Sequence, residues 1–243
     1  MKAILSDVHA NLEALRAVLD DASSRGADSV YNLGDIVGFG PNPIECIDLS
    51  MEMAVVLLGH FDHAVLFDPA FSPPSADASV SKSILWTRQV LKSSKEAPAA
   101  RQDRVEFLSG LQMSHQEAGG VLYVHGSPRS HMSEYVFPED IYNARKMARI
   151  GERFDRLCFA GHTHMPGIFV ENSREKWQFI RPDDCGRTFR LDGRRVLCNV
   201  GSVGQPRDGD WRASYVTFDG ATIQFRRVDY DREITANKMN DAR

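Results

Sequence analysis

The sequence predicts an α/β fold in which two β-sheets pack together and helices cover them from outside. The 243 residues, 42% of them hydrophobic, are enough for one large domain with a sizeable core. Strands and helices alternate in the first sixty residues, and a run of short strands follows Met165. That order favours two packed sheets over one parallel sheet. We therefore expect a single domain over residues 1–243.

The N-terminal part alternates strands with helices. Residues 2–6 form an apolar strand, and the next helix ends at Arg25 and Gly26 after apolar residues at helical spacing, namely Leu12, Leu15, Val18, Leu19 and Ala22. A strand over 28–33 and a helix over 43–51 follow. The continuous apolar run over 54–58 is typical of a strand covered on both faces. The chain therefore begins as β-α-β-α-β.

The remainder changes character twice. Residues 66–84 are rich in proline and serine and predict an irregular excursion before a helix near 80–91, so residues 66–100 form a candidate lid. Strands over 121–124 and 156–160 enclose a helical stretch over 139–150. The short strands expected after Met165 cover residues 167–170, 177–180, 195–200, 214–218 and 222–228.

Composition excludes several classes of protein. The formal net charge is only -4, so no global field attracts nucleic acid or an acidic membrane, and phosphate binding has to be local. The cysteines lack CxxC spacing, and Cys158 and Cys198 lie in apolar runs where reduced, buried thiols are common. The N-terminus has no signal-peptide pattern, and no apolar span of about 20 residues occurs. We therefore expect a cytoplasmic protein without a membrane partner.

Apolar runs repeatedly end in polar clusters that contain six of the eight histidines. The clusters are Ser6-Asp7-Val8-His9, Gly34-Asp35, Gly59-His60-Phe61-Asp62-His63, His125-Gly126 and Gly161-His162-Thr163-His164. Because loops at strand ends assemble sites from distant parts of an α/β chain, we expect these side chains to converge. Taken alone, His125 reads more readily as a core histidine and Asp35 as a helix cap. The ordered set favours a metal site instead.

The ligand types indicate which metals the site would take. Carboxylates and imidazoles without thiolates suit Mn²⁺, Fe, Zn²⁺ or Ni²⁺, and their number exceeds what one ion needs. Two divalent ions are therefore expected, with Mn²⁺ as the first choice. Such a pair generates hydroxide and clamps the oxygens of a phosphoryl group during displacement.

The ordered clusters resemble the calcineurin-like metallophosphoesterase family, and in particular its small bacterial phosphodiesterases. The family's blocks run D-x-H, G-D, G-N-H-D, G-H and G-H-x-H, and the clusters here follow that order over nearly the whole chain, with Gly59-His60-Phe61-Asp62 at the third block. The resemblance implies a four-layer α/β/β/α sandwich of two mixed β-sheets flanked by helices. It also implies the ligands: Asp7, His9 and His164 for one metal, Asp35 as bridge, and His125 and His162 for the other.

The chain departs from the family at Gly59-His60-Phe61-Asp62. His60 replaces the asparagine that binds the second metal, and Phe61 replaces the histidine that protonates the leaving group. An imidazole can replace the amide as a ligand, so we assign His60 to the second metal, although His60 or His63 taking over the proton stays an alternative. The catalytic candidates are therefore Asp35, His60, Asp62 and His63.

These observations predict a dinuclear phosphoesterase that hydrolyses phosphodiesters through a hydroxide bridging the two ions. Its substrate would be a small phosphorylated molecule, a phosphodiester or a nucleotide, contacted by Arg129 and Arg207. The tryptophans Trp86, Trp177 and Trp211 are expected to pack in the core or lid rather than stack on a base.

Three alternatives stay open. The changed residues at 60 and 61 are compatible with an impaired metal-binding or interaction module on the same fold. Phosphoprotein or phosphomonoester phosphatase activity is also compatible with the motifs. Activity on long nucleic acids is disfavoured because no Lys/Arg run marks a basic groove. The oligomeric state is not predicted.

Overall fold

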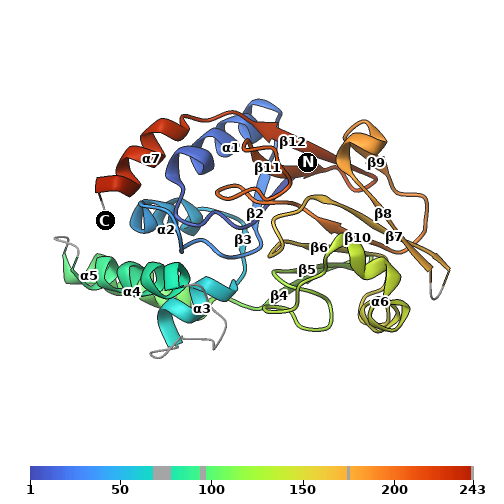
Figure 1. Cartoon of the computed structure of the whole chain (residues 1–243), viewed down its shortest axis with the longest axis horizontal. Coiled ribbons are helices and arrows are strands. Elements are labelled where there is room, and N and C mark those ends of the chain that lie inside the picture. The colour runs from blue at the N-terminus through green and yellow to red at the C-terminus, as the bar shows by residue number, and fades with distance from the viewer. Residues whose placement is uncertain (68–77, 94–96, 174–175, 242–243) are drawn as a thin grey trace.

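The computed structural model describes residues 1–67, 78–93, 97–173 and 176–241, and it contains two six-stranded sheets (Figure 1). The first sheet has the order β3 (Val55–Val56), β2 (Ser29–Asn32), β1 (Lys2–Leu5), β11 (Ala213–Phe218), β12 (Thr222–Val228) and β9 (Thr188–Arg190). The second has the order β4 (Ser114–Glu117), β5 (Val121–Val124), β6 (Leu157–Ala160), β10 (Val196–Asn199), β7 (Gly167–Ser173) and β8 (Lys176–Ile180).

Both sheets are mixed, as expected. In the first sheet β1, β2 and β3 are parallel, whereas β11 runs antiparallel to β1. In the second sheet β5, β6 and β10 are parallel, whereas β4 and β7 are antiparallel to their neighbours. The carboxyl ends of two parallel sets therefore meet between the sheets.

The helices cover the outer faces of the two sheets (Figure 1). Those packed on the side of the first sheet are α1 (Leu12–Ser24), α2 (Pro43–Met51), α3 (His60–Phe67), α4 (Ala78–Ser93), α5 (Pro98–Gly110) and α7 (Arg232–Asp241). On the second sheet lie α6 (Ala144–Gly151) and the 3₁₀ turn η1 (Pro138–Tyr142), while η2 (Pro182–Cys185) precedes β9. The four-layer sandwich is confirmed.

Alternating side chains divide the core into three clusters. In β1, Ala3 and Leu5 pack against the helices of the first sheet, while Ile4 packs between the sheets. In β5, Tyr123 lies between the sheets and Leu122 faces α6. Because side chains on a strand alternate between its two faces, one apolar run fills two layers. This explains why strands here read as continuous apolar segments.

A polar group joins the sheets within this apolar interface. The Glu117 carboxylate of β4 accepts hydrogen bonds from the hydroxyls of Tyr31 in β2, at 2.6 Å, and Tyr123 in β5, at 3.0 Å. Lys2 of β1 forms an ion pair with the same carboxylate. We call Lys2, Tyr31, Glu117 and Tyr123 the inter-sheet clasp. Its pairing satisfies a carboxylate that would otherwise be costly to bury.

Several elements differ from the sequence-based expectation. The predicted helix over 139–150 is two elements, η1 and α6, because Asn143 ends the first and its side chain caps the second by accepting from the Lys146 amide at 3.0 Å. Helices α3, α5 and α7 and strands β4 and β9 were not predicted. The helix expected near 80–91 is present as α4.

Three further expectations concern the lid, the cysteines and the membrane. The candidate lid, residues 66–100, stays a prediction, because residues 68–77 and 94–96 lie outside the described residues. Cys158 and Cys198 are free and buried in β6 and β10, as predicted. Among the helices of the described ranges, none has the length and apolar character needed to cross a membrane.

Candidate metal centre

The predicted ligands lie in loops that follow parallel strands. Asp7 and His9 follow β1 and Asp35 follows β2, its parallel neighbour in the first sheet. His125 directly follows β5, and His162 and His164 follow β6, its parallel neighbour in the second sheet. The sheets thus bring together four loops that are far apart in the sequence.

The backbone at these ligands is strained. The φ angles of Asp7, His9, Asp35, His162 and His164 are all positive, at 55°, 47°, 54°, 67° and 61°. Only Ala10 and Arg187 share this property among the non-glycine residues that the structure describes. Side chains other than glycine rarely adopt such angles, and the strain persists only where the surroundings impose it. Here hydrogen bonds impose it, for example from the Asp7 amide to the Gly34 oxygen at 2.9 Å.

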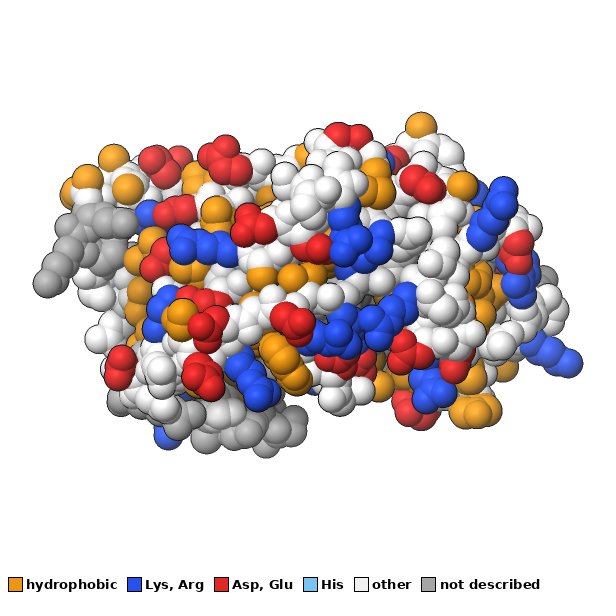
Figure 2. All heavy atoms as spheres, turned by 90° about the horizontal axis from the view of Figure 1, so that it is seen from above, with side chains coloured by type: hydrophobic (Ala, Val, Ile, Leu, Met, Phe, Trp, Pro, Cys, Tyr) orange, Lys and Arg blue, Asp and Glu red, His pale blue; other side chains and the backbone are white. Residues whose placement is uncertain are grey.

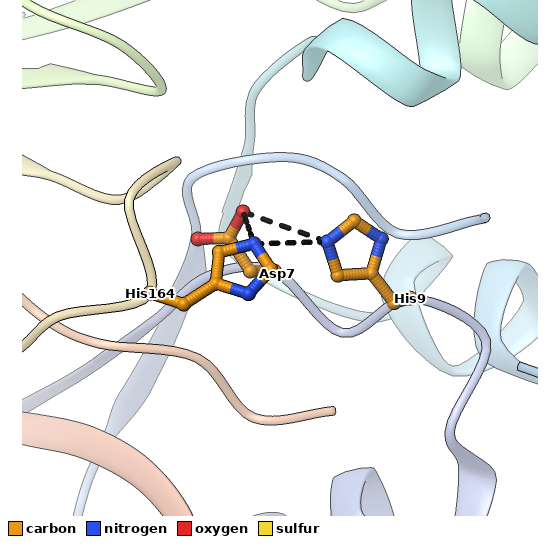
Figure 3. A group of neighbouring side chains, drawn as sticks. All are labelled: Asp7, His9 and His164. Atoms are coloured by element: carbon orange, nitrogen blue, oxygen red, sulfur yellow. Dashed lines mark hydrogen bonds and ion pairs between the residues drawn. The ribbon is translucent and has the colours of Figure 1, made fainter. Parts of the chain in front are cut away.

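Asp7, His9 and His164 form the first buried group, which we call the first triad (Figure 3). The His164 Nε2 atom lies 3.1 Å from His9 Nε2 and 3.2 Å from Asp7 Oδ1. Figure 3 shows the three side chains pointing toward one another, Asp7 and His9 from the loop after β1 and His164 from the loop after β6. The ligand atoms therefore face a common point.

Backbone carbonyls fix the tautomers of the first triad. His9 Nδ1 lies 3.3 Å from the Val37 oxygen, and His164 Nδ1 lies 2.6 Å from the Gln205 oxygen. Because a carbonyl only accepts, each Nδ1 carries a proton and donates it. Burial, followed by the charge of His164, lowers the pKa of His9 to about 4, so this ring is neutral at pH 7. Its Nε2 lone pair therefore points into the triad.

Asp35, His125 and His162 form the second triad, which is also buried. His125 Nε2 lies 3.4 Å from Asp35 Oδ2 and 3.1 Å from His162 Nδ1. The Leu33 oxygen, 3.1 Å from His125 Nδ1, orients the His125 ring as in the first triad. Burial acts to lower the pKa of His125, but the Asp35 carboxylate outweighs it and raises that pKa to about 9.

The two triads adjoin at Asp35. Its Oδ2 atom lies 3.4 Å from His125 Nε2 and 3.8 Å from His9 Nε2, so one oxygen faces a histidine of each triad. The Oδ1 atom accepts a hydrogen bond of 2.7 Å from the Phe61 amide, which fixes the carboxylate. Burial would raise the pKa of Asp35, but His125 and then His9 hold it well below its usual range. The carboxylate is therefore charged at neutral pH.

The arrangement fits a pair of divalent cations. In the first triad two imidazole lone pairs and a carboxylate oxygen face one another, an assembly of acceptors that repel unless a cation lies among them. Asp7 Oδ1 is buried without a hydrogen-bond donor, as a metal ligand would be. All six side chains supply nitrogen or oxygen, the donor set that Mn²⁺, Fe, Zn²⁺ and Ni²⁺ accept. The two clusters together indicate a dinuclear divalent site.

Two glycines allow the loops to approach so closely. A Cβ atom on Gly59 would lie 1.9 Å from the Asp35 amide nitrogen. A Cβ atom on Gly161 would lie 2.1 Å from Ser6 Oγ and 2.5 Å from Asp7 Oδ2. Neither contact is compatible with a side chain, so these positions require glycine for packing rather than for flexibility.

The residues around Phe61 lie beside the triads rather than in them. Phe61 is buried, and its ring centroid lies 5.0 Å from that of His9 and 4.8 Å from that of Phe39. The His60 ring centroid lies 5.7 Å from that of His162, and His60 belongs to neither triad in the described part of the chain. The His63 ring contacts Phe67, with 5.1 Å between centroids.

Asp62 holds the loops of the centre together. Its buried carboxylate accepts hydrogen bonds of 3.1 Å from the amides of Val37 and Gly59. Burial, followed by the charge of Asp35, raises the pKa of Asp62 to about 7. This geometry makes Asp62 a support for the loops that carry Asp35 and Gly59.

The predicted substrate-binding arginines differ in their surroundings. Arg129 is bound to Glu134, with 3.1 Å between its Nε and Oε2, and the Ser127 hydroxyl binds the same carboxylate. Arg207 is exposed, and its Nη2 donates to Gln205 Oε1 at 2.8 Å, next to the carbonyl that orients His164. The Arg207 amide also donates to the His164 carbonyl oxygen at 3.4 Å, so Arg207 adjoins the first triad, whereas Arg129 supports a loop.

Tyr135 lies at the second triad and was not among the predicted site residues. The Tyr135 ring is stacked on His162, with 3.8 Å between centroids and 16° between planes, and 41% of Tyr135 is exposed. A lone tyrosine in a loop carries no sequence signal for such a place. Of the tryptophans, Trp177 is buried in the core as expected, whereas Trp211 is 42% exposed and contacts Tyr230.

Figure 2 shows acidic and basic side chains interspersed over the face that it presents, without a continuous basic band across it. A long nucleic acid would need such a band to neutralise successive phosphates.

Comparisons with known proteins agree with the fold. Residues 1–222 match the calcineurin-like phosphoesterase superfamily domain. An uncharacterized protein of Methanocaldococcus jannaschii is 34% identical over 241 residues, covering 95% of this chain and 88% of that protein. A metallophosphoesterase structure from Sphaerobacter thermophilus is 34% identical with a TM-score of 0.79, covering 99% of this chain and 93% of that one. A hypothetical protein from Pyrococcus horikoshii, 19% identical with a TM-score of 0.61 over 99% of this chain and 93% of that one, is similar in fold. The chain belongs to the calcineurin-like phosphoesterase superfamily.

Proposed function

We propose that this protein is a dinuclear metal-dependent phosphodiesterase that uses Mn²⁺. The observation that carries the proposal is the pair of buried triads that adjoin at one oxygen of Asp35. In this proposal Asp7, His9 and His164 hold one ion, His125 and His162 hold the other, and Asp35 binds both. When bound, two such ions supply an activated water as nucleophile and stabilise the negative charge on the phosphoryl oxygens.

The chain's own groups prepare the centre for this chemistry. The carbonyls of Val37, Gln205 and Leu33 hold the histidine rings in position, a support that commonly changes metal affinity by about 10- to 100-fold. Phe39 and Phe61 pack beside His9 and exclude water from that side. We assign Arg207, which is exposed and adjoins His164, to a phosphoryl oxygen of the bound substrate.

The proton of the leaving group determines which esters react. Phe61 has no proton to give, and we assign His60, beside His162, as an additional ligand of the second ion rather than as the acid. General acid catalysis contributes about 10²- to 10⁴-fold and matters least for a leaving group that is already a stable anion. Esters with acidic leaving groups are therefore the preferred substrates.

A substrate panel tests the proposal. Protein stripped with chelator and reloaded with Mn²⁺ should hydrolyse bis-p-nitrophenyl phosphate, with kcat/KM at least about 10²-fold above that for an alkyl phosphomonoester. Protein loaded with Zn²⁺ or Ni²⁺ should be slower. Two bound ions per chain without hydrolysis of any ester would overturn the enzymatic assignment, and faster hydrolysis of a phosphopeptide would overturn the diester preference.

A double variant tests the assignment of residues 60 and 61. His60→Asn with Phe61→His restores the family's pair, and it should raise kcat on unactivated diesters by roughly 10²-fold while changing kcat on p-nitrophenyl diesters much less. His60→Ala alone should weaken binding of the second ion. If His60→Ala left both ions bound and slowed only esters with poor leaving groups, His60 would be the proton donor instead.

A further inference from the structure

The His162 ring is held differently from the other three imidazoles of the triads. The Nδ1 atoms of His9, His125 and His164 each lie beside a backbone carbonyl oxygen, at 3.3, 3.1 and 2.6 Å. His162 turns its Nδ1 atom toward His125 Nε2, at 3.1 Å, and its buried Nε2 atom has no hydrogen-bond partner in the part of the chain that the structure describes. Contacts other than a hydrogen bond at Nε2 therefore fix the plane of this ring.

Aromatic rings supply those contacts. The Tyr135 ring lies parallel to the His162 ring, with 3.8 Å between centroids and 16° between planes. Phe137 is stacked on Tyr135 in turn, with 5.4 Å between centroids and 9° between planes. The His60 ring meets His162 at a steep angle of 72°, with 5.7 Å between centroids. Rotation of the imidazole out of its plane would have to displace the Tyr135 ring, and packed aromatic pairs resist such displacement.

The stacked tyrosine comes from the same segment as the ligand His125. Gly126 follows this ligand, and a Cβ atom on Gly126 would lie 3.0 Å from the Glu134 amide nitrogen, so the chain returns closely onto its own start. The Gly126 amide closes the loop by donating to the His131 oxygen at 2.6 Å. Tyr135 is the next residue after Glu134. One segment thus supplies a ligand of the second triad and the ring that packs on the other histidine of that triad.

Polar contacts hold the end of the segment that carries Tyr135. Glu134 accepts a hydrogen bond of 3.1 Å from Arg129 Nε and another from the Ser127 hydroxyl. The Lys146 ammonium donates to the Tyr135 carbonyl oxygen at 2.8 Å. These contacts fix the backbone at this position, while 41% of Tyr135 is exposed. The side chain can therefore be exchanged without opening the core.

We infer that Tyr135 is a positioning residue for the second metal ion, because its ring holds the His162 imidazole with Nδ1 toward the second triad. The inference rests on the proposed dinuclear centre, in which His125 and His162 bind the second ion. Partners that orient a metal-binding histidine commonly change metal affinity by about 10- to 100-fold. Carbonyl oxygens orient both histidines of the first triad, so loss of the Tyr135 ring should weaken binding of the second ion alone.

Binding of Mn²⁺ to the wild type and to variants of Tyr135 tests the inference. Equilibrium dialysis with elemental analysis should show at least about tenfold weaker binding of the second ion to Tyr135→Leu and unchanged binding of the first. Tyr135→Phe keeps the ring and should keep both affinities. Tyr142→Leu is the matched control, because Tyr142 is 86% exposed in the same part of the chain, and it should bind both ions like the wild type.

Electron paramagnetic resonance gives an independent readout of the second site. At a Mn²⁺ concentration that just fills both sites of the wild type, the wild type should show the spectrum of a coupled pair of ions. Tyr135→Leu should show the spectrum of an isolated ion at the same concentration. Excess Mn²⁺ should restore the coupled spectrum and the wild-type kcat on bis-p-nitrophenyl phosphate, because the Tyr135 ring acts only through His162.

The outcomes separate the inference from the function on which it rests. Wild-type affinity for both ions in Tyr135→Leu, equal weakening of both ions, or the same loss in Tyr135→Phe would overturn the inference. A loss of kcat that persisted with both sites filled would also overturn it, because Tyr135 would then act on the substrate. Two ions bound by the wild type without hydrolysis of any ester would overturn the proposed function alone, and the metal-binding comparison would still decide the inference. Fewer than two ions bound by the wild type would overturn both.

Discussion

Replacing Asp35 by asparagine should remove metal from both triads at once. The substitution keeps the shape of the side chain, and an amide oxygen can still accept the hydrogen bond of the Phe61 amide. It removes one negative charge whose Oδ2 atom lies 3.4 Å from His125 Nε2 and 3.8 Å from His9 Nε2. At about 4 Å and an effective dielectric constant of about 20, a pair of unit charges contributes about 4 kcal/mol. That corresponds to roughly 10³-fold in affinity, of which the amide retains a part, so we expect roughly 10²- to 10³-fold weaker binding.

Equilibrium dialysis against Mn²⁺ with elemental analysis measures this effect directly. Asp62→Asn is the matched control, because its carboxylate is equally buried but accepts only from backbone amides such as those of Val37 and Gly59. Asp62→Asn should lose stability and weaken metal binding far less than Asp35→Asn, because Asp62 supports the loops without facing the triads, whereas Asp35→Asn should lose both ions and keep its far-ultraviolet circular dichroism. Wild-type affinity for two ions in Asp35→Asn would refute the bridging role, and equal metal loss in the two variants would refute the distinction between them.

Three further predictions follow from the structure. Glu117→Gln should lower the free energy of unfolding by about 1–2 kcal/mol, seen as a lower Tm in calorimetry, since its charged hydrogen bonds join the sheets but are partly exposed. Burial would raise the pKa of the Glu117 carboxyl group, but the hydrogen bonds of the inter-sheet clasp lower that pKa in the folded protein. The stabilisation is therefore present above pH 4.5 and is lost as the pH falls through the lowered pKa of the folded state. A difference in Tm that persisted in acid would contradict this. Gly161→Ala should destabilise the protein by roughly 1–3 kcal/mol and weaken metal binding, because the new Cβ atom would lie 2.1 Å from Ser6 Oγ. The control Gly110→Ala should have neither effect, because there is open space around its new Cβ atom. Mn²⁺ uptake at pH 7 should release protons, because the pKa of His125 in the metal-free protein is about 9 and only neutral imidazole binds metal. Calorimetry in buffers of different ionisation enthalpy measures this release. Heats of binding that do not depend on the buffer would contradict the prediction.

Much of the fold was predictable because its signals are local. Ala3, Ile4 and Leu5 are buried on both faces of β1, so an unbroken apolar run there directly indicates a covered strand. Helix α1 shows its apolar stripe in the sequence itself, and the structure adds its cap, Asn11. Helix α5 gives no such signal, because only Arg104 and Leu108 of its residues are buried and its amphipathic pattern is weak.

The candidate site was predictable in its members and not in its geometry. The resemblance of the Asp and His clusters to the family named all six residues of the triads, and it also named His60, which belongs to neither triad in the described part of the chain. The neighbours of the triads could not be predicted from the sequence. Tyr135, for example, reaches His162 through a loop whose path depends on contacts of Glu134 and Lys146. Likewise, the sequence could not show that Phe61 packs its ring against His9 while its backbone supports Asp35.

The strained backbone of the ligands explains why the centre depends on its surroundings more than on any single loop. Positive φ angles at Asp7, His9 and Asp35 are unfavourable for each loop alone, and they persist because the loops hydrogen-bond to one another, as between the His9 amide and the Asp35 oxygen at 2.9 Å. Gly59 permits the approach, and Asp62 ties the Gly59 amide to that of Val37. The charge of the centre works against this assembly, because two carboxylates and several imidazole lone pairs converge in a buried space. In the metal-free protein a proton on His125 offsets part of that charge, and two divalent cations would offset all of it. If the triads bind metal as proposed, metal binding would therefore stabilise the folded loops.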